Sequence, residues 1–107
     1  PTCPDCGAVI RPDIVFFGEN LPEDKINRFF EELDRGFDIF FSIGTTSVFP
    51  YIRQPMALAR HLGRPTIEIN PDHTEISDWV DIKISLGAAE AMDAVWKSFS
   101  EEERIAT

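Results

Sequence analysis

The sequence predicts an α/β fold built on a parallel sheet, and three observations support this. The run 37–43 is apolar on both faces, as a strand covered by helices on both sides of a sheet should be. Segments with helical spacing alternate with strand-like runs along the chain, and short loops join them. This alternation favours right-handed βαβ crossovers. The 107 residues fit one compact domain or part of a larger one.

The N-terminal part predicts one extended segment and one helix. Residues 14–17 are β-branched and aromatic and lie between Pro12-Asp13 and Gly18, so we interpret them as a strand or extended segment. A helix follows near Pro22, which suits a first helical turn, and Gly36 ends it. Its apolar positions at i, i+3, i+4 and i+7 are Ile26, Phe29, Phe30 and Leu33.

The run 37–43 predicts the first buried strand. Asp38 within it is either a solvated strand start or a buried, partnered carboxylate, and the sequence leaves both open. A helix is expected over 54–62, because Pro55 is tolerated only in a first turn and Gly63 can end it.

Two further strands and a last helix complete the predicted pattern. The strand 65–71 comes first, and then 80–85, whose alternating apolar and polar residues indicate an edge strand. The last helix begins near Ala88. We expect one face of it to pack through Met92, Val95, Trp96 and Phe99.

The composition excludes several classes of partner. A formal charge of −9 opposes nonspecific attraction to nucleic acid or to an anionic membrane surface. No apolar run approaches the roughly 20 residues that span a bilayer, and no signal peptide is recognisable. Only two cysteines, in Cys-x-x-Cys spacing, favour a reducing compartment, and we expect a cytoplasmic location.

Cys3 and Cys6 have the spacing of one zinc knuckle. A structural zinc needs about four ligands, and this pair supplies two. The chain therefore predicts half of a metal site, with the other half upstream, on a second copy of the chain, or nonexistent. Metal binding is favoured over redox chemistry because Cys-Pro-x-Cys-Gly is a common zinc-knuckle turn.

The carboxyl ends of parallel strands form the ligand crevice of an open α/β sheet. Three loops are thereby nominated, 44–47, 70–73 and 86–88. Gly44 permits close backbone approach, and the hydroxyls that follow suit phosphate or ribose oxygens. A plain turn and helix cap is the alternative interpretation of Gly-Thr-Thr-Ser. Nominated as nucleotide-binding residues are Gly44, Thr45, Thr46, Ser47, Asn70, Pro71, Leu86 and Gly87.

Four segments, taken in order, carry a resemblance that covers nearly the whole chain. They are Cys3-Pro-Asp-Cys6-Gly7, Arg11-Pro12-x-Ile-Val-Phe-Phe17-Gly18-Glu19-x-Leu21-Pro22, Ile43-Gly44-Thr45-Thr46-Ser47-Val-Phe-Pro50 and Ile69-Asn70. In this order and approximate spacing they resemble the sirtuins, a family of NAD-dependent protein lysine deacylases. The chain looks like the C-terminal portion of a bacterial member.

The resemblance implies specific roles. Cys3 and Cys6 are the second half of a structural four-cysteine zinc site. The 44–47 loop lies at NAD, and Asn70 holds the adenosine ribose. Substrate-binding residues follow from the same resemblance: Val15 and Phe17 touch the acyl-lysine stem, whereas Gly18 and Glu19 form the peptide clamp, where the substrate pairs as an added strand.

The resemblance also implies an organisation and a function. Residues 1–13 are then the remnant of a zinc module, 14–99 the C-terminal half of a Rossmann-like NAD-binding domain, and 100–107 a polar tail. The family's phosphate loop, nicotinamide pocket and catalytic His-Gly are absent from these residues. His61 and His73 are expected to be exposed.

The expected function is NAD-dependent removal of acyl groups from protein lysines, with this chain contributing NAD and peptide binding and being inactive alone. Its partners are an acylated protein and the missing N-terminal half or a second copy. A noncatalytic module for NAD or ADP-ribose is the alternative. A stand-alone zinc-ribbon interaction domain is disfavoured by the α/β pattern.

Overall fold

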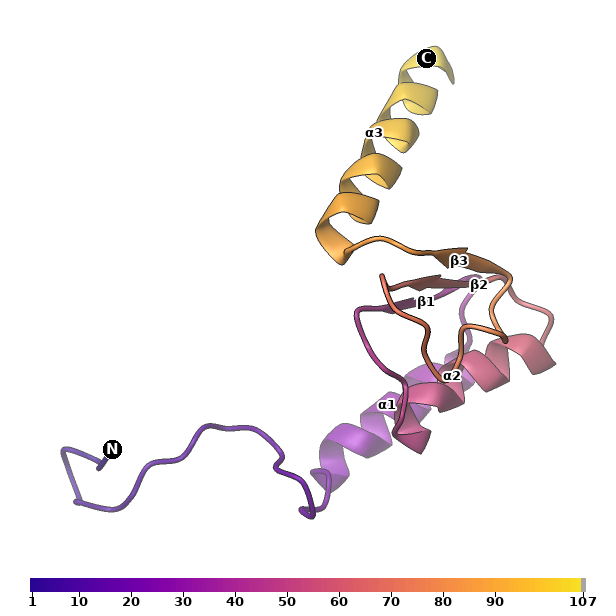
Figure 1. Ribbon diagram of the computed structural model, residues 1–107. Coiled ribbons are helices and arrows are strands. Elements are labelled where there is room, and N and C mark those ends of the chain that lie inside the picture. Colours follow the sequence, from indigo (N-terminus) through magenta and orange to yellow (C-terminus); the bar gives the residue numbers. More distant parts are fainter. Residues whose placement is uncertain (107) are drawn as a thin grey trace. The chain divides into compact units, whose positions relative to one another are not determined.

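The computed structural model describes residues 1–106, which separate into two compact units (Figure 1). The first unit is Pro1–Arg35, and the second begins at Gly36. The predicted parallel sheet lies entirely in the second unit.

The N-terminal unit contains a short turn, an irregular segment and one helix. A single antiparallel bridge joins Thr2 to Val9. Of the two alternatives expected over 14–17, a strand or an extended segment, the strand is not formed, and the chain turns at Phe16, whose carbonyl accepts a hydrogen bond from the Glu19 N–H at 3.1 Å. Gly18 has φ +83°, a left-handed value that a strand does not accommodate.

Helix α1 (Glu23–Arg35) agrees with the predicted helix. The Ile26 N–H donates to the Pro22 carbonyl at 3.0 Å, so Pro22 lies at the entrance, where its missing N–H costs nothing. Leu33 is buried, as the apolar spacing predicts. Gly36 ends the helix with φ +84°.

The second unit contains a sheet of three parallel strands in the order β1 (Phe40–Ile43), β2 (Thr66–Ile69) and β3 (Ile82–Ile84). The predicted parallel sheet, and the edge position of the last strand, are therefore confirmed. The strands are shorter than expected. Asp38 precedes β1, is fully exposed and lies 3.9 Å from Arg64, which identifies it as a solvated residue before the strand.

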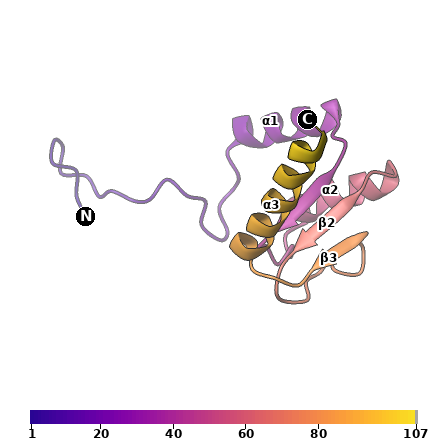
Figure 2. The same cartoon turned by 90° about the horizontal axis from the view of Figure 1, so that it is seen from above.

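Helices α2 (Pro50–His61) and α3 (Ala88–Ala106) lie on opposite sides of the sheet (Figure 1), and Figure 2 shows α3 crossing over it. The predicted start of α2 is wrong by four residues. The helix begins at Pro50, so Pro55 lies inside it and cannot donate a hydrogen bond to the Tyr51 carbonyl. Residues 100–106 continue α3.

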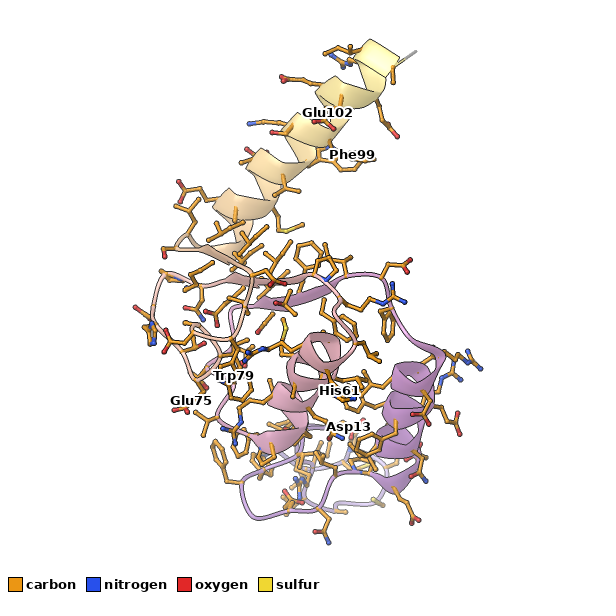
Figure 3. The ribbon with its side chains drawn as sticks, turned by 90° about the vertical axis from the view of Figure 1, so that its right-hand side faces the viewer. Asp13, His61, Glu75, Trp79, Phe99 and Glu102 are labelled. Carbon is orange, nitrogen blue, oxygen red and sulfur yellow. The ribbon has the colours of Figure 1, made fainter. Side chains whose placement is uncertain are left out.

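The core of the second unit is small. Its buried apolar side chains are Phe40, Met56, Ala59, Ile69, Ile76 and Ala91. The expected packing face of α3 is instead exposed, with Trp96 66% and Phe99 50% accessible. Figure 3 shows Phe99 and Glu102 on the part of α3 that extends beyond the sheet. Among the described residues, no helix combines the length and apolarity needed to cross a bilayer.

Candidate functional site at the carboxyl ends of the strands

The carboxyl ends of the three strands are tied together by main-chain hydrogen bonds. The Gly44 N–H, just after β1, donates to the Ile69 carbonyl at 2.9 Å. The Asn70 N–H, just after β2, donates to the Ile84 carbonyl at the end of β3 at 3.1 Å. The loops nominated from the sequence therefore begin at one edge of the sheet, where parallel α/β folds bind ligands.

The loop 44–47 adopts a tight and strained conformation. Gly44 has φ +66° and Ser47 has φ +58°. A non-glycine residue in this left-handed region is uncommon and costs free energy. The Thr45 Oγ1 accepts a hydrogen bond from the Ser47 N–H at 3.2 Å, which helps to hold the turn. Such strain is often found at ligand sites.

Ser47 carries the most informative polar group of this loop. Its side chain is buried, with 1% exposure, and its Oγ has no hydrogen-bond partner among the described residues. A buried hydroxyl without a partner costs about 1–3 kcal/mol. This unsatisfied group is what a site for a polar ligand should contain.

The Asn70 side chain connects this loop to the end of β2. Its Nδ2 donates to the Thr45 carbonyl at 3.1 Å, and its Oδ1 accepts from the Asp72 N–H at 3.0 Å. The side chain is buried and fixed at both ends. One amide hydrogen and one lone pair remain, which suit a pair of ribose hydroxyls.

A buried ion pair, not predicted from the sequence, lies directly under Asn70. Glu68 on β2 is fully buried, and its register partner on β3 is Lys83. The Lys83 Nζ lies 3.4 Å from the Glu68 Oε1. In the sequence, each charge stands between two isoleucines and has the alternation of a solvent-facing strand position, so only the strand register reveals the pair.

Hydroxyl groups complete the surroundings of Glu68. The Ser77 Oγ donates to the Glu68 Oε1 at 2.5 Å, and the Thr74 Oγ1 donates to Oε2. Desolvation raises the pKa of this carboxyl, but the hydrogen bonds from Ser77 and Thr74 and the charge of Lys83 together hold it below its usual range. Glu68 is therefore an ionised, fully satisfied anion at neutral pH.

A polar hollow opens beside the loop 44–47 and encloses about 360 Å³. Its size falls within the range of small-molecule sites, about 300–1,000 Å³. It is lined by Thr46, Val48, His73, Thr74, Glu75 and Asp78, of which Figure 3 labels Glu75. His73 is exposed, 3.6 Å from the Asp78 carboxylate, and His61 is also exposed, as predicted.

The remaining nominated residues are less closely joined to the loop. Pro71 is exposed and separates Asn70 from Asp72. Leu86 follows β3 and is 37% exposed. The Gly87 carbonyl accepts the Ala91 N–H at 3.0 Å and so begins α3. The structure thus brings together loop 44–47 and Asn70, with 86–87 following the adjacent strand.

In the N-terminal unit, backbone hydrogen bonds close a tight turn over residues 3–8. The Gly7 N–H donates to the Cys3 carbonyl at 2.9 Å, and the Cys3 N–H donates to the Ala8 carbonyl at 2.8 Å. Hydrogen bonds from the backbone of Cys6 and Asp5, and from the Cys6 side chain, lower the pKa of the Cys3 thiol. Within residues 1–106, no group of three or more metal-ligating side chains is present. Cys3 and Cys6 are both free thiols.

The segment predicted to bind the substrate peptide is held in shape, within the same unit, by an ion pair between Arg11 and Glu19. The Arg11 guanidinium donates to both Glu19 carboxylate oxygens, at 2.7 and 3.2 Å, and to the Ile14 carbonyl at 3.1 Å. The Phe16 N–H also donates to Glu19. The Arg11 guanidinium also lies over the Phe16 ring, with its Cζ 4.5 Å from the ring centre, and Phe17 is 91% exposed.

Comparison with known proteins gives consistent matches. Residues 1–50 match the sequence model of the Sir2 family. NAD-dependent protein deacylase 2 from Pseudomonas aeruginosa is 43% identical over 95 residues, which are 89% of this chain and 37% of that protein. The crystal structure of a Sir2 homologue in complex with NAD superimposes with a TM-score of 0.80 at 34% identity, over 95% of this chain and 40% of that one. A Sir2–p53 peptide–NAD⁺ structure gives 0.75 at 31%, over 94% and 41%.

The parallel sheet and its helices have the Rossmann-like α/β fold of the matching Sir2 structures. The chain belongs to the Sir2 family. It spans about two fifths of the length of the relatives that it matches.

Proposed function

We propose that the chain supplies part of the NAD site and the acyl-lysine peptide clamp of an NAD-dependent protein deacylase, corresponding to its C-terminal portion. The names of the relatives support this activity, and so do the NAD and peptide present in the structures of Sir2 homologues. The observation that carries the proposal is the Ser47 hydroxyl, which is buried without a partner among the described residues, in the loop whose Thr45 carbonyl accepts the Asn70 side-chain amide.

NAD, when bound, supplies the ribose carbon that the acyl oxygen attacks and nicotinamide as the leaving group. The residues of this chain bind and orient. Gly44 lets the cofactor approach the backbone, and Thr45, Thr46 and Ser47 present hydroxyls to its oxygens. Asn70 holds the adenosine ribose, whereas Pro71, Leu86 and Gly87 border the site.

The peptide clamp uses the N-terminal unit. Val15 and Phe17, both exposed, contact the acyl-lysine stem, and Gly18 and Glu19 present the backbone to which the substrate peptide adds as a strand. The Arg11–Glu19 contact keeps this segment in shape without a substrate.

In the proposed mechanism, the residues of this chain do not transfer protons. The sequence has two histidines, both exposed, and neither contributes to loop 44–47 or to the Asn70 contacts. The resemblance to the sirtuins implies that the general base on the ribose hydroxyls is a histidine outside these residues. A noncatalytic module for NAD or ADP-ribose is the second candidate, and the exposed histidines favour it for the isolated chain.

Zinc is proposed as a structural ion. Cys3 and Cys6 would hold it with two further thiolates from the N-terminal half or a second copy of the chain, at about one zinc per four thiolates. Free thiols are consistent with the reducing conditions of the cytoplasm, which is the proposed location.

The experiment is a calorimetric titration of the 107-residue chain with ADP-ribose, paired with an assay for nicotinamide release from NAD and an acetylated peptide. Saturable binding without nicotinamide release is expected. Absence of binding would contradict the nucleotide site, whereas release of nicotinamide would contradict only the claim that the isolated chain is inactive.

A further inference from the structure

The Glu68–Lys83 pair lies where β2 and β3 end, directly before the loop that carries Asn70. Residues 68 and 83 are register partners on adjacent parallel strands. Glu68 is fully buried, and the Lys83 side chain is 23% exposed. Burying two charges is costly unless each is fully hydrogen-bonded, so the contacts of the pair show what it holds in place.

Glu68 holds the part of the loop after β2 that contains Thr74 and Ser77. Its carboxylate accepts hydrogen bonds from the hydroxyls of Thr74 and Ser77. The Thr74 N–H donates to the Ser77 Oγ at 2.8 Å, which closes a small turn against β2. The segment from Thr74 to Ser77 is therefore attached to the sheet through one buried carboxylate.

Lys83 holds the start of the same loop, at Asn70 and Asp72. Its ammonium group donates to the main-chain carbonyl of Asn70 and, at 2.9 Å, to that of Asp72. Bonds from a charged donor are roughly twice as strong as neutral ones. Lys83 thus joins the two carbonyls that flank Pro71.

Asn70 is consequently held at four points. Its N–H donates to Ile84, its carbonyl accepts from Lys83, and its side chain contacts Thr45 and the Asp72 N–H. Lys83 makes one of these contacts directly and a second one indirectly, because it also holds the Asp72 carbonyl. Loss of the ammonium group therefore releases the carbonyls of Asn70 and Asp72 and loosens the loop after β2.

We propose that Lys83 is a positioning residue for nucleotide binding. It sets the Asn70 side chain at the ribose by clamping the carbonyls of Asn70 and Asp72, and buried Glu68 supplies the charge that keeps the ammonium group in place. This inference rests on the proposed function, since the ligand is the ADP-ribose part of NAD.

Three variants and a control test the proposal. Lys83→Met removes the donors, Lys83→Arg retains charged donors, and the double variant Glu68→Gln with Lys83→Met removes the pair without stranding a buried charge. The control is Asp81→Asn at the opposite end of the same strands. There the Asp81 carboxylate accepts the Thr66 N–H at 2.9 Å and the Thr66 hydroxyl at 3.1 Å. The control therefore weakens the sheet without touching the Asn70 loop.

Two measurements are made on each variant in the whole chain: the ADP-ribose dissociation constant, and hydrogen exchange of the Asn70 side-chain amide by NMR without ligand. Lys83→Met and the double variant should weaken binding about tenfold, the value of one hydrogen bond, and should accelerate the exchange. Lys83→Arg should recover most of the affinity. Asp81→Asn should lower the unfolding midpoint without changing either quantity.

The outcomes separate the two proposals. If the original chain binds ADP-ribose and Lys83→Met binds it equally well, the positioning role is wrong. The positioning role is also wrong if Asp81→Asn weakens binding as much as Lys83→Met, because the effect is then one of general stability. If neither the original chain nor any variant binds ADP-ribose, the proposed function fails, whereas accelerated exchange in Lys83→Met alone would still support the clamp on Asn70.

Discussion

The side-chain amide of Asn70 donates a hydrogen bond to the main-chain carbonyl of Thr45 at 3.1 Å, across 25 residues of sequence. This bond connects the loop after β1 to the end of β2. The proposed nucleotide site depends on this connection, because one ligand can contact both loops only if they are held together.

Replacing Asn70 by alanine should therefore affect both stability and binding. Two side-chain hydrogen bonds are lost, and the free energy of unfolding should fall by about 1–3 kcal/mol, measured by urea denaturation. ADP-ribose affinity should fall by at least about tenfold, since the ribose contact is also lost. Unchanged affinity in a folded Asn70→Ala protein would remove Asn70 from the site.

Ser47→Ala should separate stability from binding. The Ser47 hydroxyl is buried without a partner among the described residues, so its removal relieves a desolvation penalty, and the free energy of unfolding should stay the same or rise by about 1 kcal/mol. Affinity for ADP-ribose should fall, because the hydroxyl is available only to the ligand. A loss of stability with intact binding would show that Ser47 has a structural partner instead.

Gly44→Ala tests the tight turn after β1. A Cβ at this position meets nothing within 4 Å, so the cost comes only from the φ of +66° and should be about 1–2 kcal/mol in unfolding free energy. Gly63→Ala is the matched control, with φ +67° and equally open surroundings. Both variants should be destabilised alike, but only Gly44→Ala should bind ADP-ribose more weakly; equal weakening would contradict the role of this turn.

The ionised state of Glu68 predicts an acid-sensitive stability. Its pKa in the folded chain is lowered, so its contribution is fully present above the unfolded-state value of about 4.3 and disappears as the pH falls through the lower folded-state pKa. Glu68→Gln should be less stable than the original chain near neutral pH, and this difference should shrink as the pH falls below about 4. Urea denaturation over this range measures it, and a difference independent of pH would argue against an ionised Glu68.

The sequence was sufficient to predict the order of the elements, the parallel sheet and the edge position of β3. These features follow from the periodicity of apolar residues, which depends only on neighbours along the chain. Loop 44–47 and Asn70 were predicted because both follow strands, and parallel strands end at one edge.

Features that depend on contacts distant in sequence were not predicted. Glu68 and Lys83 attract no attention until the register places them side by side. The run 14–17 has strand composition but turns at Phe16, since no neighbouring strand pairs with it in its unit. The apolar face of α3 is exposed although its spacing predicts packing, because spacing says which residues share a face and not what covers it.

The central claim is that the strand-end loops of this chain hold the ADP-ribose part of NAD. The most direct test is a titration of the chain with ADP-ribose followed by backbone amide NMR. Saturable shifts are predicted at Gly44, Ser47, Asn70 and Asp72. Saturable shifts confined instead to the hollow lined by Ala57, Arg60, His61 and Trp79, or no saturable shifts at all, would contradict the claim.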